Sequence, residues 1–61
     1  MQTYYALMNT DGKYMRRYIR TYTAADLTNA EIFRTRGAAA KANAETKHLG
    51  MIVKLEINII R

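Results

Sequence analysis

The chain has no cysteine and no serine, and its three glycines stand far apart in the sequence. Without cysteine it can form neither a disulfide framework nor a thiolate zinc site, and it has no thiol nucleophile. Without serine it lacks the Ser/His pair of many hydrolases. The separated glycines Gly12, Gly37 and Gly50 cannot form a glycine-rich loop that cradles a phosphate. These absences remove the commonest catalytic arrangements.

Other catalytic groups are equally sparse. His48 is the only histidine, and it stands beside Lys47 near the expected end of a helix, where a histidine is usually a surface or helix-end group. The five carboxylates are scattered, whereas general acid/base catalysis or metal binding needs several of them to converge on one cleft. We therefore expect a protein that is not an enzyme and that uses neither a cofactor nor a metal.

Long hydrophobic segments and linkers are also missing. The 61 residues contain no apolar run of membrane-spanning length, and the first residues lack the basic and apolar regions of a signal peptide. We expect one domain over residues 1–61, located in the cytoplasm and not bound to a membrane. A domain of this length buries only about 60% of its unfolded surface, so a second copy or a partner would add useful burial.

Positive charge is what the chain does have. Ten Lys and Arg residues against five Asp and Glu residues give a net charge of +5 and a pI near 9.9. A balance of this kind favours a nucleic acid or an acidic protein surface as partner.

The most regular apolar pattern lies at residues 51–60. It alternates with a period of two, which indicates a strand with one buried face. We expect the odd-numbered positions to build the core, namely Met51, Val53, Leu55, Ile57 and Ile59.

Residues 3–9 and 14–22 are expected to form a β-hairpin around Asp11-Gly12, because Asp-Gly is typical of a two-residue type I′ turn. That turn places Asn9 opposite Tyr14, whereas a one-residue bulge would exchange the faces of one strand. In either register, a continuous strand keeps alternate residues of the second segment on one side of the sheet.

A helix is predicted from Arg36 to His48. Thr35 is a good N-cap, alanine is the best helix former, and Gly50 is a typical terminator. Ile32 and Phe33 precede it as an apolar plug for the core. The buried stripe of the helix is expected to contain Ala38, Ala39, Ala42 and Leu49.

Together these elements predict an α+β fold of the order β-β-α-β. One helix would cover one face of a small three-stranded antiparallel sheet with the strand order 2-1-3. The last strand would lie at an edge, where a second copy could pair with it, and we therefore expect a homo-oligomer.

One alternating set of tyrosine and arginine residues is the candidate binding site. Arginines at strand spacing can follow a phosphate backbone while tyrosines stack on unpaired bases, but the same residues are enriched at protein interfaces and on the wet faces of sheets. We expect the start of the helix to extend this surface. The candidate residues are Tyr14, Arg16, Arg17, Tyr18, Arg20, Tyr22, Arg34, Arg36 and Lys41.

The chain resembles short phage and prophage proteins with a strand-hairpin-helix-strand layout. The resemblance is carried by Tyr5-Ala6-Leu7 leading to Gly12-Lys13-Tyr14, by residues 29–35 with the Ala-rich helix, and by residues 52–57. It implies an accessory role, such as an inhibitor of a host defence or a small regulator. We expect a protein that occupies a host protein or nucleoprotein surface; the alternatives are direct binding of single-stranded nucleic acid and a structural role in a virion or scaffold.

Overall fold

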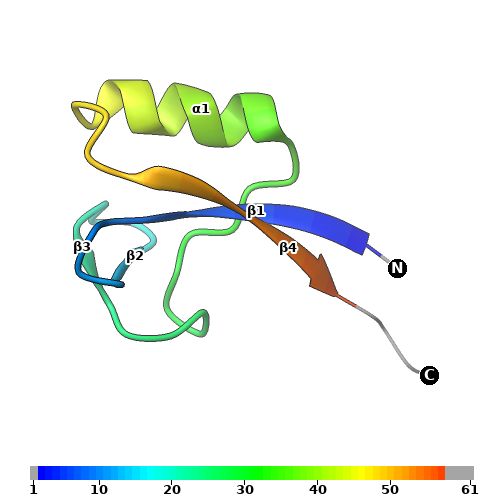
Figure 1. The fold of residues 1–61 in the computed structure, drawn as a ribbon, viewed down its shortest axis with the longest axis horizontal. Helices are drawn as coiled ribbons and strands as arrows, with labels where there is room; N and C mark the ends of the chain where they lie inside the picture. The colour runs from blue at the N-terminus through cyan, green and yellow to red at the C-terminus, as the bar shows by residue number, and fades with distance from the viewer. Residues whose placement is uncertain (1, 58–61) are drawn as a thin grey trace.

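Strand β1 (Gln2–Met8) lies inside a four-stranded antiparallel sheet in the computed structural model, which describes residues 2–57 (Figure 1). The order is β3-β2-β1-β4. Within these residues, one helix packs against one face of the sheet. The other elements are β2 (Tyr14–Met15), β3 (Tyr22–Ala24), α1 (Arg36–Glu45) and β4 (Met51–Ile57). The α+β class and the antiparallel pairing of the last strand with the first are confirmed, but the prediction of three strands is wrong.

The turn after β1 is one residue longer than Asp-Gly alone. Asn9 donates its N–H to the carbonyl of Lys13 over 2.9 Å, and Gly12 donates to the carbonyl of Asn9 over 3.1 Å. The side-chain oxygen of Asn9 also accepts from the backbone of Asp11 and Lys13. Gly12 has a φ of 77°, a conformation that glycine adopts without strain. The result is a three-residue loop with a glycine bulge.

This extra residue changes the register of the hairpin. Tyr14 lies opposite Met8 and not opposite Asn9, so the register predicted from a two-residue turn is wrong. Tyr14 consequently shares the face of Met8, while Met15 lies with Leu7 on the face that the helix covers. The alternative with a one-residue bulge describes what the structure shows.

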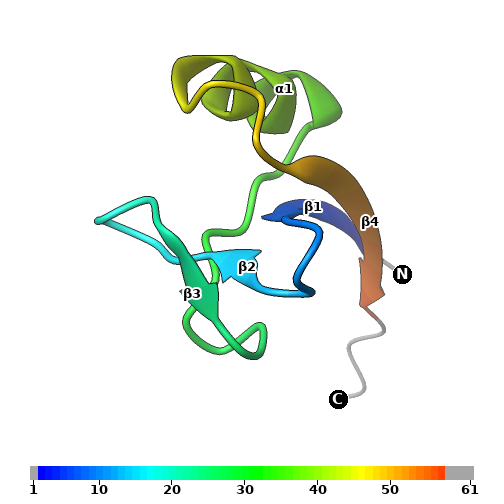
Figure 2. The ribbon, with the colours of Figure 1, turned by 60° about the vertical axis from the view of Figure 1, so that its left-hand side comes forward.

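The expected long strand over residues 14–22 is interrupted. β2 ends at Met15, the chain turns at residues 17–20, and β3 returns antiparallel to β2, with Met15 opposite Tyr22. The alternating tyrosines and arginines therefore do not share one side of the sheet, contrary to the prediction. Figure 2 shows this turn projecting from one side of the molecule while β4 lies on the other.

The core lies between the helix and one face of the sheet. Its buried residues are Leu7, Met15, Phe33, Ala39 and Ala42, and three half-buried side chains pack around them: Tyr5, Tyr22 and Ile52. The side chain of Phe33 is buried in this cluster, so its predicted role in the core is confirmed. Two backbone hydrogen bonds to Tyr5, of 2.7 and 2.8 Å, hold it in place. Its neighbour Ile32 is exposed and does not belong to the plug.

The face of β4 that packs against the core is not the predicted one but the other. The register places Ile52 opposite Leu7 and Val53 opposite Ala6. Residues paired in this way share a face, so Ile52 joins the core while Met51, Val53 and Leu55 face away from the helix. Met51 is 56% exposed. The side chain of Ile57, and Ile59, lie outside the described part of the chain.

Helix α1 begins as predicted and ends earlier. Thr35 is the N-cap, and its hydroxyl accepts from the N–H of Ala38 over 3.1 Å. The C-cap is Thr46, and the helix ends where Lys47 adopts a φ of 68°. The N–H of His48 then donates to the carbonyl of Asn43 over 2.8 Å, as in a Schellman motif. Lys47, and not Gly50, is therefore the left-handed terminator.

The shorter helix also changes its buried stripe. Ala39 and Ala42 are buried, but Ala38 is exposed and Leu49 lies beyond the helix with its side chain in solvent. Gly50 is needed for a different reason than helix termination. A Cβ atom there would overlap the phenol oxygen of Tyr22, because the tyrosine ring packs directly against the glycine backbone.

Candidate functional site

The tyrosines and arginines predicted to form one surface separate into three environments. Tyr14 is half-buried on the sheet face away from the helix. Tyr22 packs into the core on the other face, where its phenol oxygen is buried without a hydrogen-bond partner among the described residues. The residues between them form the turn at positions 17–20, which we call the arginine–tyrosine turn. This turn is the candidate site.

Backbone hydrogen bonds close the arginine–tyrosine turn tightly. Arg16 donates its N–H to the carbonyl of Thr21 over 2.7 Å, and Arg20 donates to the carbonyl of Arg16 over 3.0 Å. Within the turn, the N–H of Ile19 reaches the carbonyl of Arg17 over 2.9 Å. This last bond joins residues two apart and makes a γ-turn centred on Tyr18.

Tyr18 is held in a strained backbone conformation. Its φ is 72°, and Arg20 has a φ of 50°. The left-handed region costs a residue other than glycine roughly 1–2 kcal/mol, because the Cβ atom approaches the following carbonyl. Such strain persists only where surrounding contacts hold it, and it is concentrated at functional sites.

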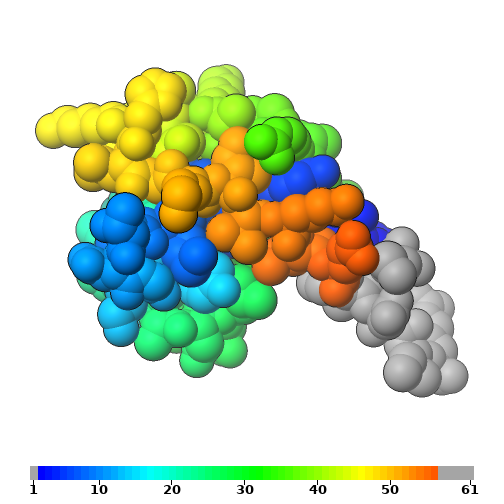
Figure 3. Space-filling model, viewed as in Figure 1, coloured from blue at the N-terminus to red at the C-terminus, as the bar shows by residue number. Residues whose placement is uncertain are grey.

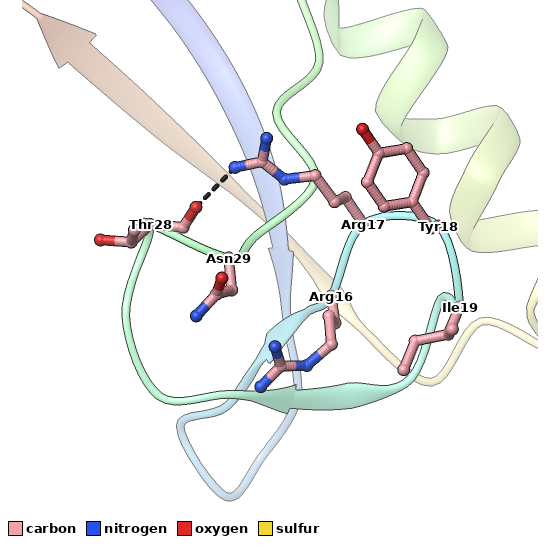
Figure 4. A pocket seen from close by; sticks show the side chains of 6 residues that line it. All are labelled: Arg16, Arg17, Tyr18, Ile19, Thr28 and Asn29. Carbon is pink, nitrogen blue, oxygen red and sulfur yellow. Dashed lines mark hydrogen bonds between the residues drawn. The ribbon is translucent and has the colours of Figure 1, made fainter.

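Arg17 anchors the turn to the connector between β3 and α1. Its N–H donates to the carbonyl of Asn29 over 3.1 Å, and its guanidinium donates to the carbonyl of Thr28 over 2.5 Å. Figure 4 shows Arg17 reaching from the turn to the backbone of Thr28. Two bonds from one residue thus fix the near end of the turn.

Arg20 anchors the far end through two carboxylates. Its guanidinium lies 3.3 Å from Glu31 of the connector and 3.4 Å from Glu45 at the end of α1. The hydrogen bond and the negative charge of Glu31 raise the pKa of Arg20, with a smaller contribution from Glu45. Exposed ion pairs add little stability, so we assign this pair of contacts a positioning role.

Arg16 runs along the neighbouring strand. Its Nε donates to the hydroxyl of Thr23 over 3.1 Å, and a terminal nitrogen lies 3.5 Å from the carbonyl of the same residue. A shallow depression of about 450 Å³ lies beside it. The residues lining it are Arg16, Arg17, Tyr18, Ile19, Thr28 and Asn29 (Figure 4).

The side chains at the top of the turn are exposed to an unusual degree. Tyr18 is 92% exposed and Ile19 is 64% exposed. Among the described residues, Arg16 and Arg17 have no acidic partner within ion-pair distance. The turn and the adjoining Arg16 therefore offer an aromatic ring, an aliphatic side chain and two positive charges on a backbone that many contacts hold in place.

The basic residues of the helix lie elsewhere. Arg34 lines a second hollow at the start of β1, together with Gln2, Thr3 and Tyr4. The arginine–tyrosine turn contacts the opposite end of α1 through Glu45, and a ten-residue helix is about 15 Å long. Contrary to the prediction, Arg36 at the helix start therefore does not extend the surface of the turn. Lys41 lies exposed on the helix.

Sequence reasoning missed several residues of this site. Ile19, Thr28 and Asn29 line it, and Glu31 and Glu45 hold it, but the alternating pattern directed attention to a strand face. Asp26, Thr28 and Asn29 are turn-forming residue types, which indicate a loop but no binding role. Residues 14–22 contain no glycine or asparagine, so the sequence carries no local signal for the turn.

The described residues hold no group of three histidines, aspartates or glutamates that could bind a metal ion. In residues 2–57, no helix is both long and apolar enough to cross a membrane. No family model matches the chain, and no curated protein and no solved structure is significantly similar to it.

Proposed function

We propose that this chain is a small non-enzymatic binding protein of the phage type, which occupies a surface of a host protein or nucleoprotein complex through its arginine–tyrosine turn. The observation that carries the proposal is Tyr18, a strained tyrosine that is 92% exposed on a turn fixed at both ends. A large aromatic side chain displayed in this way has no folding role. Its exposure and strain are explained if it fills a pocket in a partner.

The composition of the turn suits a protein interface. Tyrosine and arginine are the residues most enriched among binding hot spots, and such residues act by filling desolvated pockets. Arg17 lies beside the ring of Tyr18, whereas Arg16 lines the same depression but points away from the ring (Figure 4). Together they give this region a positive charge, which complements an acidic rim. We therefore expect the partner surface to be an apolar pocket surrounded by carboxylates.

Preorganisation strengthens the proposal. The contacts of Arg17 and Arg20 hold the backbone of the turn before any partner arrives. Ordering a flexible side chain at an interface costs about 0.5–1.5 kcal/mol, and a turn already held in its bound form avoids much of the corresponding backbone cost.

Direct binding of single-stranded nucleic acid is less well supported. It required alternating stacking and phosphate-binding side chains on one face, but Tyr14 and Tyr22 lie on opposite faces and Arg20 is engaged by two carboxylates. One exposed ring remains, which is a small stacking platform for a single strand.

The test is capture from host extract with the purified chain as bait, with and without nuclease. We expect capture of a protein to survive nuclease and to be lost in Tyr18→Ala and Ile19→Ala. Met51→Ala is the matched apolar control, because Met51 is also more than half exposed, and Arg36→Ala is the matched basic control. Both controls should bind as the unmodified chain does.

Salt dependence separates the two kinds of partner. Binding to a phosphate backbone weakens steeply as salt rises, because each contacted phosphate releases a counterion. Capture that disappears with nuclease, or that falls with salt at the slope of several phosphate contacts, would contradict the proposal. So would equal capture by Tyr18→Ala and the unmodified chain.

A further inference from the structure

The free edge of β4 is a second interaction surface, independent of the arginine–tyrosine turn. β4 is seven residues long and stands last in the strand order, and no described segment pairs with its outer edge. In Figure 3 the orange atoms of β4 lie along the front of the molecule, and neither the helix nor the connector covers them. An open strand edge is a template for another strand.

The backbone groups directed to this free edge can be identified from the hydrogen bonds of β1. Tyr5 exchanges both of its backbone hydrogen bonds with Phe33, so its N–H and C=O point away from β4. Lys54 lies opposite Tyr5 and must therefore direct its own N–H and C=O outwards. The direction alternates along a strand, so Ile52 and Glu56 also present their backbone groups to the free edge.

Charge selects one way in which two copies of β4 can pair about a two-fold axis. An axis through Lys54 or through Glu56 places like charges opposite each other, which is destabilising. An axis through Val53 leaves both charged residues without a charged partner. An axis through Leu55 places each Lys54 opposite the Glu56 of the other copy, and the outward backbone groups of these two residues then face each other.

We infer that β4 pairs antiparallel with β4 of a second copy, with Leu55 opposite Leu55 and two Lys54–Glu56 pairs beside it. The sheets of the two copies then form one continuous sheet. Within one chain Lys54 and Glu56 already lie 3.5 Å apart, and both side chains are more than half exposed, so they are free to exchange partners across the axis.

The core of one chain is small, so pairing of two copies would add buried apolar surface. Among the described residues only Leu7 and Met15 are large side chains that are buried completely. Leu55 and Val53 are half-buried on the face away from the helix, and pairing places the two copies of Leu55 in contact. The arginine–tyrosine turn lies on the opposite side of the molecule, so both turns of the dimer stay accessible (Figure 2).

Analytical ultracentrifugation over a series of protein concentrations tests the pairing. Lys54→Glu or Glu56→Lys alone replaces both attractive pairs by repulsive ones, and we expect each to weaken dimerisation by about tenfold or more. The double variant Lys54→Glu/Glu56→Lys restores complementary charges and should dimerise within about twofold of the unmodified chain. Lys41→Glu on the helix changes the net charge by the same amount as Lys54→Glu and is the control for that variant.

A disulfide cross-link tests the register. The chain has no cysteine, so Leu55→Cys can form a bridge only between copies. The pair at the axis does not exchange hydrogen bonds, and its Cα atoms lie about 4.5 Å apart, within the range that a disulfide spans. Two cysteines in Glu56→Cys would lie about 9 Å apart, which is too far.

We expect mild oxidation to convert Leu55→Cys, and not Glu56→Cys, to a covalent dimer. A chain that stays monomeric up to millimolar concentration would overturn the inference, as would charge reversals that leave dimerisation unchanged or a double variant that fails to restore it. Circular dichroism of each variant shows that it is folded. An unmodified chain that does not dimerise but still captures its host partner would overturn this inference alone and leave the proposed function standing.

Discussion

Replacing Tyr18 by glycine should make the isolated protein more stable. The side chain is 92% exposed, so its removal sacrifices almost no packing, while its φ of 72° suits glycine. Relief of the left-handed conformation contributes roughly 1–2 kcal/mol. The greater freedom of glycine in the unfolded chain offsets about 0.4–1 kcal/mol of this. The expected net gain is therefore about 0.5–1 kcal/mol in the free energy of unfolding.

The assay is unfolding by urea and by heat at one fixed protein concentration, followed by circular dichroism. For a domain of this size the gain corresponds to a rise in Tm of about 2–8 °C. Tyr18→Ala is the control, because it removes the same ring but retains the strained backbone, and it should leave stability nearly unchanged. A Tyr18→Gly protein no more stable than Tyr18→Ala would refute the view that strain is held at this turn.

Three further predictions concern the packing around the helix. Gly50→Ala should lower the free energy of unfolding by about 1–3 kcal/mol, because the new methyl group overlaps the ring of Tyr22. In a double-mutant cycle measured by urea unfolding, Tyr22→Ala should remove most of this loss. Burial raises the pKa of Tyr22, opposed by the nearby Thr46 hydroxyl, whose own proton is donated to the helix carbonyls. The folded protein thus favours the neutral phenol of Tyr22. The contribution of this group to the free energy of unfolding is complete below the ordinary tyrosine pKa, and it is lost as the pH rises through the raised pKa of the folded protein. Tyr22→Phe should raise the free energy of unfolding by about 1 kcal/mol near neutral pH and reduce the loss of stability at alkaline pH. A lower free energy of unfolding in urea would contradict this reasoning. Thr35→Ala should cost about 1 kcal/mol through loss of the N-cap bond to Ala38, whereas Thr35→Ser should cost much less; equal losses would contradict the capping role.

Local chemistry made part of the fold predictable. The cap at Thr35 and the alanines after it define the helix start, and these features act within a few residues of chain. The antiparallel pairing of the last strand with the first follows from the helix that returns the chain across the sheet just before β4. Phe33 was predicted in the core because it is a single large apolar residue placed just before the helix.

The turn at Tyr18 could not be predicted from the same kind of information. Residues 14–22 are rich in β-favouring side chains and contain no glycine or asparagine to mark a left-handed position. The conformation is held by Thr28, Asn29, Glu31 and Glu45, which are distant in the sequence. Tertiary contacts outweigh local propensity here, and the candidate site changed from a strand face to a turn.

The face of β4 was mistaken for a related reason. Both alternating sets of residues in this strand contain large apolar side chains, so periodicity alone did not decide which set faces the helix. The register with β1 decides it, because Ile52 lies opposite Leu7. That register depends on the pairing of two strands more than 40 residues apart in the chain.

Photo-cross-linking from position 18 tests most directly whether the arginine–tyrosine turn is the binding surface. A photoreactive phenylalanine in place of Tyr18 is compared with the same residue in place of Tyr14, which is half-buried on the sheet. In nuclease-treated host extract we expect cross-links to a protein from position 18 and few from position 14. Equal yields from both positions, or cross-links from position 18 to nucleic acid alone in untreated extract, would contradict the account.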